Sequence, residues 1–385
     1  MKRICFLTDS IFSFGGVQRV TAVIAKELAK DYDVTIVTKD KLEQKDTTFY
    51  ELDKANIHYR FFSFPEVSRW KYYFCKAYSY LYRRYLPQTR LTSDLYANSL
   101  FPREQRKALY RELKEGNYDV IIGVHAPLAI RLASCRRHLR GTRLIGWIHN
   151  SYEALFGEGS LYIGPELCKH YEFQLAKLDH TIVLCRDDAQ KYHITTEVIY
   201  NPLTLVPGPP SEGTSKKFLA VGRFSRLHKG FDLLIEAFRI FAQDNKEWTL
   251  DIVGEGVEEP LYRKYIKEYQ LQERIHIHPF TNNIQQYYHE AQAYVLSSRW
   301  EGFGLVLVEA MAHGLPIISS NLPTSKEILG DFGLYFVNGD VNGMARQMHA
   351  ATQLDWNSTS RKAIEIAHRF NLETISRQWQ QIIEA

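Results

Sequence analysis

The sequence contains no long apolar run, and its cysteines form no recognisable pattern. No uninterrupted apolar stretch approaches the roughly 18 residues that a membrane-spanning helix requires. Any contact of this protein with a membrane is therefore expected to be peripheral. The five cysteines are odd in number and widely scattered, and they include neither a Cys-x-x-Cys pair nor a Cys/His metal spacing. They indicate reduced thiols in a cytosolic protein.

The sequence also lacks a strong excess of charge and a signal-peptide pattern. Its formal net charge at pH 7 is only +4, which is too small by itself to indicate a nucleic-acid-binding protein. The first residues, MKRICFLTDS, hold two basic side chains but only a short apolar run before a strand-and-turn pattern, so we expect no signal peptide. The 385 residues, of which 45% are hydrophobic and 24% charged, are typical of a soluble globular protein with two domains.

Strands and amphipathic helices alternate along most of the chain. In the first part, the strand pattern RICFLTD is followed by a turn, a helical pattern over residues 17–32 and the strand pattern DVTIVTK. Residues 200–217 interrupt this alternation with four prolines and two glycines, and the alternation begins again at KFLAVGRF. We therefore predict an α/β fold of two doubly wound, Rossmann-like domains that face each other across a cleft, with ligands at the carboxyl ends of the strands.

Two glutamates stand close to a predicted helix start in the second half of the chain. In SSRWEGFGLVLVEAMAHGLP, a strand is followed by Glu301 and by a helix that begins near Gly304 and ends near Gly314. The free backbone N–H groups of such a helix start bind anions. Glu301 and Glu309 lie near that end, and carboxylates suit sugar hydroxyls rather than phosphate. The alternative is an ordinary helix start with one solvated and one capping glutamate.

Two basic residues follow another strand in the same half. In VGRFSRLHKGFDLL, a strand ends at Arg223, and Lys229 precedes a helix that begins near Phe231. A planar guanidinium and a mobile ammonium on one loop suit a diphosphate. The alternative is a solvated basic loop.

Together these motifs resemble those of the retaining glycosyltransferases of family 4, which have the two-domain GT-B architecture. The resemblance rests on the GR strand end, the following KG and, about seventy residues later, EGFGLVLVEAMAHGLP, in which Glu301 and Glu309 match an E-x7-E signature. Weaker matches in the first half are Gly15 and Gly16 after the first strand and the IHN strand end at His149.

The resemblance implies three parts of the chain. Residues 1–200 would form a Rossmann-like domain that binds the acceptor, and residues 201–365 would form a second one that binds the nucleotide sugar. The last helix, within residues 366–385, would cross back to the first domain. The enzyme would work in the cytoplasm, peripherally at the inner face of the cell membrane, in the synthesis of a bacterial surface polysaccharide.

The resemblance also assigns roles in the second domain. Arg223 and Lys229 would bind the donor diphosphate, Glu309 would hold the nucleotide ribose, and Glu301 would contact the hydroxyls of the reacting sugar. The backbone amides at the following helix start would cap the diphosphate, and they belong to Phe303, Gly304 and Leu305.

In the first domain, the resemblance implies three further site residues. His149 would face the donor sugar from the acceptor side, which makes it a candidate catalytic residue together with Glu301. Gly15 would lie on the acceptor side of the first loop, and Gly16 would let that loop approach the donor.

The expected chemistry requires neither a metal ion nor another cofactor. Departure of a nucleoside diphosphate develops negative charge, which fixed N–H dipoles and the Arg/Lys pair stabilise. The DYD sequence at 31–33 fits a helix end, and His276 and His278 alternate on a strand as structural residues do. The GEG sequence at 254–256 lacks the third glycine of a dinucleotide-binding fingerprint. The retaining outcome is implied by the resemblance, and we assign no enzymatic nucleophile.

One segment of the first half combines basic and aromatic residues. Residues 69–90, RWKYYFCKAYSYLYRRYLPQTR, contain six Lys/Arg, eight aromatic residues and no acid. This composition suits an anionic membrane surface, and also a lipid-linked phosphate or an anionic glycan. A core helix with a solvated basic face is the alternative, and we expect no nucleic acid because the rest of the chain needs no such partner. The residues expected to contact membrane or acceptor are Arg69, Trp70, Lys76, Arg83 and Arg84.

These features predict a retaining glycosyltransferase. It would move a hexosyl or N-acetylhexosaminyl group from a nucleotide-diphosphate sugar, a UDP-sugar, to a glycan or lipid-linked glycan. A sugar-nucleotide epimerase of the same fold is one alternative, which needs acid and base groups in the cleft and no acceptor. A non-catalytic sugar-nucleotide-binding subunit is another, but it would tolerate the loss of Glu301 or Arg223, and all four donor-site charges are present.

Overall fold

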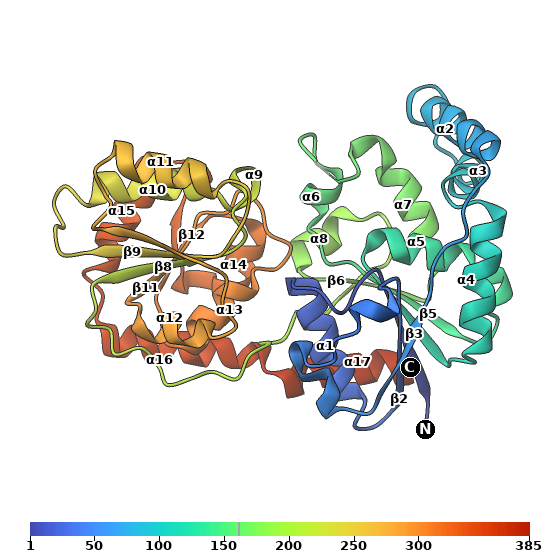
Figure 1. Cartoon of the computed structure of the whole chain (residues 1–385), viewed down its shortest axis with the longest axis horizontal. Coiled ribbons are helices and arrows are strands. Elements are labelled where there is room, and N and C mark those ends of the chain that lie inside the picture. The colour runs from blue at the N-terminus through green and yellow to red at the C-terminus, as the bar shows by residue number, and fades with distance from the viewer. Residues whose placement is uncertain (161) are drawn as a thin grey trace. The chain divides into compact units, whose positions relative to one another are not determined.

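The chain folds into two compact units (Figure 1). The computed structural model describes residues 1–160 and 162–385. The first unit comprises Met1–Asn201 together with Leu372–Ala385, and the second comprises Pro202–Asn371. Each unit holds one sheet in which every neighbouring pair of described strands is parallel. The predicted α/β fold of two doubly wound, Rossmann-like domains is therefore confirmed.

The described strands of the first unit form a seven-stranded sheet in the order β3-β2-β1-β4-β5-β6-β7. Their apolar runs are continuous because helices cover both faces of the sheet. The order of the strands reverses between β1 and β4, so their carboxyl ends mark a topological switch point, where open α/β sheets bind ligands. The strands are β1 (Arg3–Thr8), β2 (Asp33–Thr38), β3 (Ile57–Phe61), β4 (Val120–Val124), β5 (Arg143–Trp147), β6 (His180–Val183) and β7 (Glu197–Val198).

The last helix of the chain packs on this first sheet. The indole ring of Trp379 meets that of Trp147 edge-on at a centroid distance of 4.7 Å. The ammonium of Lys2 donates a hydrogen bond of 3.1 Å to the carbonyl of Ile383. The helices of this unit are α1 (Gly16–Leu28), α2 (Arg69–Arg84), α3 (Arg90–Leu100), α4 (Arg103–Glu115), α5 (Ala126–Ser134), α6 (Tyr152–Phe156), α7 (Cys168–Leu175), α8 (Arg186–Lys191) and α17 (Leu372–Glu384).

The described strands of the second unit form a six-stranded sheet in the order β10-β9-β8-β11-β12-β13. Its switch point lies between β8 and β11. The strands are β8 (Lys217–Val221), β9 (Thr249–Val253), β10 (Ile275–His278), β11 (Ala293–Leu296), β12 (Ile317–Ser320) and β13 (Leu334–Phe336). The helices are α9 (Arg226–Lys229), α10 (Phe231–Phe241), α11 (Glu259–Glu268), α12 (Ile284–Glu290), α13 (Leu305–Ala312), α14 (Pro323–Leu329), α15 (Val341–Ala351) and α16 (Trp356–Ala367).

The core of the second unit is rich in aromatic side chains. Phe218 of β8 stacks on Trp248 at 4.6 Å and meets Phe241 of α10 edge-on at 5.1 Å. All three rings are buried. Such offset and edge-on pairs stabilise a core beyond the area that they bury.

The proline-rich segment lies along the second unit rather than hanging free. The amide of Ser211 donates to the carbonyl of His313 at 2.9 Å, and the amide of Gly208 donates to that residue's Nε2 at 3.3 Å. At the other boundary, the second unit continues beyond the expected residue 365 to Asn371. It does so because Phe370 packs edge-on against Phe303 and Arg369 bonds to the carbonyl of Ile328.

The basic aromatic segment forms α2 and the start of α3. Of the 16 residues of α2, only Tyr82 is buried. The helix therefore contributes one buried side chain to the core of the first unit and exposes most of the others. None of the described helices, α2 included, has the length and apolar character that crossing a bilayer demands.

Candidate active site

The start of α13 lies at the switch point of the second sheet. Gly304 adopts a left-handed conformation, with φ at +90°, directly before the first residue of α13. A residue with a Cβ is strained at that angle, which is why this position favours glycine. Phe303 is buried against Phe370, and its anchoring fixes the direction of the helix start. The predicted amides of Phe303, Gly304 and Leu305 thus follow one another at the expected helix terminus.

Glu301 is buried in the loop before α13 and is held by several donors. Its carboxylate Oε1 lies 2.6 Å from Nζ of Lys229 and 2.5 Å from Oγ of Ser298. Only 8% of the residue is exposed. Burial is the largest single influence and raises the pKa of Glu301, but Lys229 and the neighbouring His228 together outweigh it and hold this pKa well below its ordinary value. Glu301 is therefore ionised at any physiological pH.

His228 adds a weaker influence on the same carboxylate. Its Nε2 lies 3.8 Å from Oε2 of Glu301, too far for a hydrogen bond, so it acts through charge only when it is protonated. Its ring stacks on Trp300 with 3.7 Å between centroids and 3° between the ring planes. This stack joins the loop after β8 to the loop after β11.

Lys229 and Arg223 lie on the loop after β8, as predicted. Lys229 is the last residue of α9, and its carbonyl accepts a hydrogen bond of 2.7 Å from Oγ of Ser297. Arg223 is exposed. A Cβ built on the neighbouring Gly222 would lie 3.0 Å from Cε of Lys229, so the lysine stem runs close beside this strand end. The two predicted cations therefore share one loop, with Arg223 facing solvent and Lys229 turned to Glu301.

The GEG sequence supports this loop. A Cβ on Gly254 would lie only 2.0 Å from the carbonyl oxygen of Gly222. The amide of Phe224 donates to the carbonyl of Glu255 at 2.7 Å. Glycine is required at residue 254 because two backbones meet there, which gives this sequence a role without a dinucleotide.

Glu309 is buried one turn further along α13, and only 2% of it is exposed. Oε2 accepts a hydrogen bond of 2.9 Å from the hydroxyl of Tyr288, and Oε1 accepts one of 3.4 Å from Thr204. Sequence reasoning missed both donors. Tyr288 is a fully buried residue of α12, and Thr204 belongs to the proline-rich segment. These two neutral donors, one on each oxygen, fix the direction of the Glu309 carboxylate.

The glycine pair of the first unit marks the start of α1. Gly15 is the residue before the helix, and Gly16 is its first residue. The amide of Gly15 donates to the hydroxyl of Tyr50 at 3.0 Å, and that hydroxyl donates to the carbonyl of Ser13 at 2.9 Å. Tyr50, which the sequence reasoning did not single out, thus holds the first loop in place from a neighbouring segment.

His149 follows β5 and is buried, with 5% of it exposed. Its ring lies 4.2 Å from that of Trp147 and 5.3 Å from that of His125, between ring centroids. Burial first, and the neighbouring His125 second, lower the pKa of His149 well below its ordinary value. Neither ring nitrogen has a hydrogen-bond partner within residues 1–160 and 162–385. His149 is therefore a neutral imidazole with unused hydrogen-bonding capacity.

His125 is a second histidine that the sequence reasoning missed. It follows β4 in the same way as His149 follows β5, and its φ of +75° is unusual for a residue other than glycine. Burial lowers its pKa too. The strand-end sequence GVHAP was the available signal, since strained residues at strand ends often belong to sites.

His276 and His278 form a polar group with Asp251 on the outer strands of the second sheet. Their ring nitrogens lie 3.1 Å and 3.4 Å from Oδ1 of Asp251. The three residues have the separation that one metal ion would need. However, the ammonium of Lys217 lies 3.1 Å from Oδ2 and already neutralises the carboxylate. We interpret the group as a polar network around the ion pair of Lys217 and Asp251.

Two open cavities lie apart from the predicted donor residues. One, of about 270 Å³, is lined by the proline-rich segment, Lys217 and α12. The other, of about 700 Å³, belongs to the first unit and is lined by residues that include Gln88, Arg90, Lys169 and His193. The donor candidates instead lie at the carboxyl edge of the second sheet.

Two parallel-sheet units of this kind are the GT-B architecture, and comparison with known proteins agrees. The sequence model described as "Glycosyltransferase Family 4" matches residues 14–208, and that of "Glycosyl transferases group 1" matches residues 206–369. The chain belongs to glycosyltransferase family 4, and it is a glycosyltransferase.

Individual relatives resemble the chain to different extents. A protein of Haemophilus influenzae described as a glycosyltransferase is 27% identical, and the match covers 83% of this chain and 81% of that protein. The lipopolysaccharide 1,6-galactosyltransferase of Salmonella typhimurium is 31% identical over 32% of this chain and only 36% of its own length. The structure of Anabaena HepE in complex with UDP and glucose covers all of both chains with a TM-score of 0.75. Its 19% identity shows the fold alone.

Proposed function

We propose that this glycosyltransferase moves a sugar from a nucleotide-diphosphate sugar, a UDP-sugar, to a glycan or a lipid-linked glycan, and that it retains the anomeric configuration. The observation that carries the proposal is the buried ion pair of Lys229 and Glu301 beside the start of α13. This arrangement offers charges for a diphosphate and a carboxylate for sugar hydroxyls at one strand edge. The UDP and glucose named for HepE, which has the same fold, support a UDP-sugar as donor.

The residues of the second unit suit the departure of a nucleoside diphosphate. As the bond to the sugar breaks, negative charge grows on the phosphate oxygens. The exposed guanidinium of Arg223, the ammonium of Lys229 and the amides at the start of α13 would stabilise that charge. Glu309 would accept hydrogen bonds from the ribose, oriented by Tyr288. On this basis we propose that the reaction needs no divalent cation.

His149 is the proposed sugar contact from the first unit. Buried imidazole nitrogens without partners are unfavourable by about 1–3 kcal/mol, unless another molecule supplies a donor or an acceptor. Sugar hydroxyls can both donate and accept, so a neutral imidazole suits them. Gly15 and Gly16 are proposed to border the acceptor and the donor, respectively.

The proposed setting is the synthesis of a bacterial surface polysaccharide at the cytoplasmic face of the membrane. The Salmonella relative is a lipopolysaccharide galactosyltransferase, which supports a glycan acceptor that is attached to a lipid. The proposed transfer concerns a hexosyl or an N-acetylhexosaminyl group.

A panel of nucleotide sugars tests the donor. The purified protein is heated with UDP-, GDP- and ADP-sugars, and a bound donor raises the melting temperature by mass action. The sugar that shifts it is then incubated with the protein and with glycan fragments, and the products are separated. Free UDP with a lengthened glycan supports a transferase, whereas a new sugar that stays on UDP identifies an epimerase. Binding without any product from a wide set of acceptors would favour the non-catalytic subunit.

A further inference from the structure

Helix α2 carries large apolar side chains that the fold leaves exposed. Its inward face carries Tyr78 and Tyr82, and the ring of Tyr82 stacks on Tyr96 of α3 at 4.3 Å. The adjacent, outward side carries Trp70, Phe74 and Leu81, which are 79%, 73% and 46% exposed. Residues four and eleven positions apart share one side of a helix. Packing on the fold accounts for the inward tyrosines but not for these exposed apolar side chains, which therefore require another explanation.

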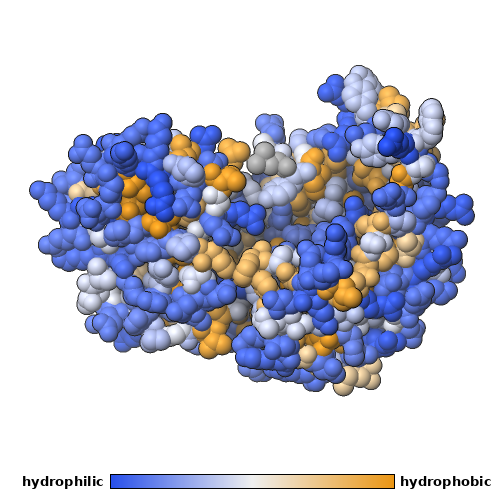
Figure 2. Space-filling model, in the orientation of Figure 1, coloured by the Kyte–Doolittle hydropathy of each residue, from blue (hydrophilic) through white to orange (hydrophobic). Residues whose placement is uncertain are grey.

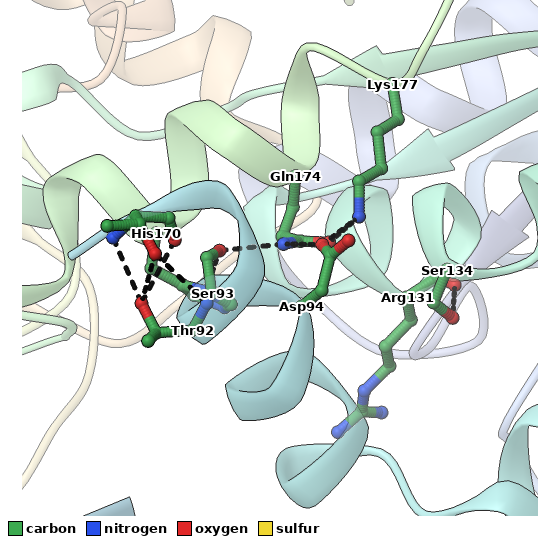
Figure 3. Close-up of polar contacts among 9 residues, drawn as sticks. Thr92, Ser93, Asp94, Arg131, Ser134, His170, Gln174 and Lys177 are labelled. Carbon is green, nitrogen blue, oxygen red and sulfur yellow. Dashed lines mark hydrogen bonds and ion pairs between the residues drawn. The ribbon is translucent and has the colours of Figure 1, made fainter. Parts of the chain in front are cut away.

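Helix α2 packs on a helix that is itself bonded to the rest of the first unit. α3, on which it packs, is tied to α7 by a polar network that Figure 3 shows. Ser93 Oγ lies 2.8 Å from Nδ1 of His170 and accepts a hydrogen bond of 2.8 Å from Gln174. Gln174 and Lys177 both bond to Asp94. Ser93 and His170 are completely buried, so we interpret their contact as structural and not as a catalytic nucleophile with its base.

The charges of the segment divide into two groups. Lys71 pairs with Glu104, and Arg83 lies 3.2 Å from the hydroxyl of Tyr96 and 3.6 Å from Glu166. These two cations therefore serve the fold. Four others have no carboxylate at ion-pair distance within the described parts of the chain, and they are Arg69, Lys76, Arg84 and Arg90.

The free cations stand beside aromatic rings on the outer side. The ammonium of Lys76 lies 4.7 Å from the ring centre of Tyr72, and the guanidinium of Arg84 lies 5.2 Å from that of Tyr80. The acids on elements packed against α2 are already engaged, since Glu104 and Glu166 pair with α2 itself and Asp94 pairs with Lys177. The outer surface of α2 is therefore positive, and Figure 2 shows hydrophilic, intermediate and hydrophobic residues gathered over it.

We propose that α2 is a membrane-docking helix that lies flat on an anionic bilayer. Trp70, Phe74 and Leu81 enter the boundary between headgroups and acyl chains, while Lys76 and Arg84 contact lipid phosphates. The tyrosines suit the headgroup level, with ring inward and hydroxyl outward. A second copy of the chain fits this face poorly, because two such faces would bring like charges together. The inference deepens the proposed function and rests on it for the lipid-linked acceptor.

Vesicle sedimentation tests the proposal directly. The full chain is mixed with vesicles of phosphatidylcholine alone or with 30% phosphatidylglycerol, in low salt and in 0.5 M salt. We expect binding only with the anionic lipid and a loss of binding in high salt. The variant Lys76→Ser/Arg84→Ser should bind roughly 30-fold more weakly, which corresponds to about 1 kcal/mol for each cation. Phe74→Ser should weaken binding even at low salt.

A control variant on another helix removes the same number of positive charges as the α2 double variant. Arg263 and Lys264 of α11 are exposed, so Arg263→Ser/Lys264→Ser should bind vesicles like the wild type. Lipids with brominated chains should quench Trp70, and Trp70→Phe should abolish that part of the quenching. The proposal is overturned if the α11 variant loses as much vesicle binding as the α2 variant. It is also overturned if the wild type does not bind anionic vesicles at low salt. The protein could instead form a dimer that resists salt, does not bind vesicles and dissociates in Phe74→Ser. That result would show that a second copy of the chain covers α2.

The vesicle test of the docking helix and the nucleotide-sugar test of the proposed function can fail independently of each other. The α2 variants should keep the same shift in melting temperature with a UDP-sugar, because none of them touches the donor residues. A protein that binds vesicles but no nucleotide sugar would refute the donor and leave the docking helix standing. A protein that binds a UDP-sugar but ignores anionic vesicles would refute the docking helix alone.

Discussion

The ammonium of Lys229 lies 2.6 Å from the carboxylate of Glu301, and the two side chains are only 12% and 8% exposed. One follows β8 and the other follows β11, strands that are neighbours in the sheet although the residues stand 72 positions apart. A cation proposed for the diphosphate and an anion proposed for the sugar are thus held by each other. Lys229 helps to keep Glu301 charged, and the contact fixes both side chains in direction, so little rearrangement is needed during reaction.

The first prediction separates binding from turnover. Glu301→Ala should lower kcat at least about tenfold, because hydrogen bonds to the reacting sugar strengthen in the transition state. Arg223→Ala should chiefly raise the KM for the nucleotide sugar, since it removes an exposed contact to the diphosphate. Steady-state kinetics on both variants check this. Wild-type parameters in Glu301→Ala would remove this residue from the site.

The second prediction concerns the stability of the ion pair. Lys229→Met leaves a buried carboxylate without its cation and should lower the free energy of unfolding by about 3 kcal/mol. The double variant Lys229→Met/Glu301→Gln should recover most of that loss while staying inactive. Urea unfolding at pH 7 measures both. Additive losses in the double variant would mean that the two side chains do not interact in solution.

Acid should weaken the same pair in a defined direction. The pKa of Glu301 is lowered on folding, so the carboxylate stabilises the fold at pH values above its unfolded pKa near 4.5. This stability is lost as the pH falls below 4.5 toward the folded pKa. The difference in unfolding free energy between the wild type and Glu301→Gln should therefore shrink between pH 6 and pH 3. A constant difference would contradict the lowered pKa.

The third prediction follows from a contact that only the structure shows. Tyr288→Phe removes the hydroxyl that donates a hydrogen bond to Glu309 and keeps the aromatic ring. Donor affinity should fall roughly tenfold, because the carboxylate would no longer be held toward the ribose. Tyr287→Phe, on the same helix, is the matched control. Titration calorimetry with UDP measures both, and equal affinities for the two variants would show that Glu309 does not hold the nucleotide through Tyr288.

The sequence predicted the elements that follow local rules. Buried strands such as β1 and helix starts such as Gly304 are specified by a few adjacent residues, and they were found at the expected places. The E-x7-E spacing correctly placed Glu301 and Glu309 about the start of one helix. Contacts between residues of different strands could not be predicted. They depend on β8 and β11 being neighbours in the sheet, which the sequence does not reveal.

The residues that were missed come from segments without a repeating pattern. Thr204 lies in the proline-rich segment, where no periodicity marks a side chain that points inward. Tyr288 looks like any aromatic residue of an amphipathic helix. For α2 the sequence shows that basic and aromatic residues are concentrated there, but it does not show in which direction each basic side chain points. Arg83, expected to face the membrane or the acceptor, turns instead toward Tyr96 and Glu166.

The fourth prediction concerns metal removal. Turnover should survive incubation with EDTA followed by desalting, because Arg223, Lys229 and the start of α13 supply positive charge at the diphosphate. Added Mg²⁺ or Mn²⁺ should change kcat less than twofold. His276→Gln serves as control, since the polar group around Asp251 should not affect activity. An absolute requirement for a divalent cation, restored after chelation, would refute this account of the phosphate site.

The last prediction uses His149 as a reporter of burial. Its pKa is lowered well below the ordinary value of about 6.5, so the folded protein keeps it neutral while the unfolded chain takes up a proton. Stability that depends on the neutral form is present above pH 6.5 and is lost as the pH falls below it. Melting temperatures of the wild type should therefore decline between pH 7.5 and pH 5 more steeply than those of His149→Phe. Activity should not change with the ordinary titration of a histidine at this residue, because His149 stays neutral throughout that range. A wild type and a variant with the same pH dependence would show that water reaches His149, and its proposed contact with the sugar would then lose its support.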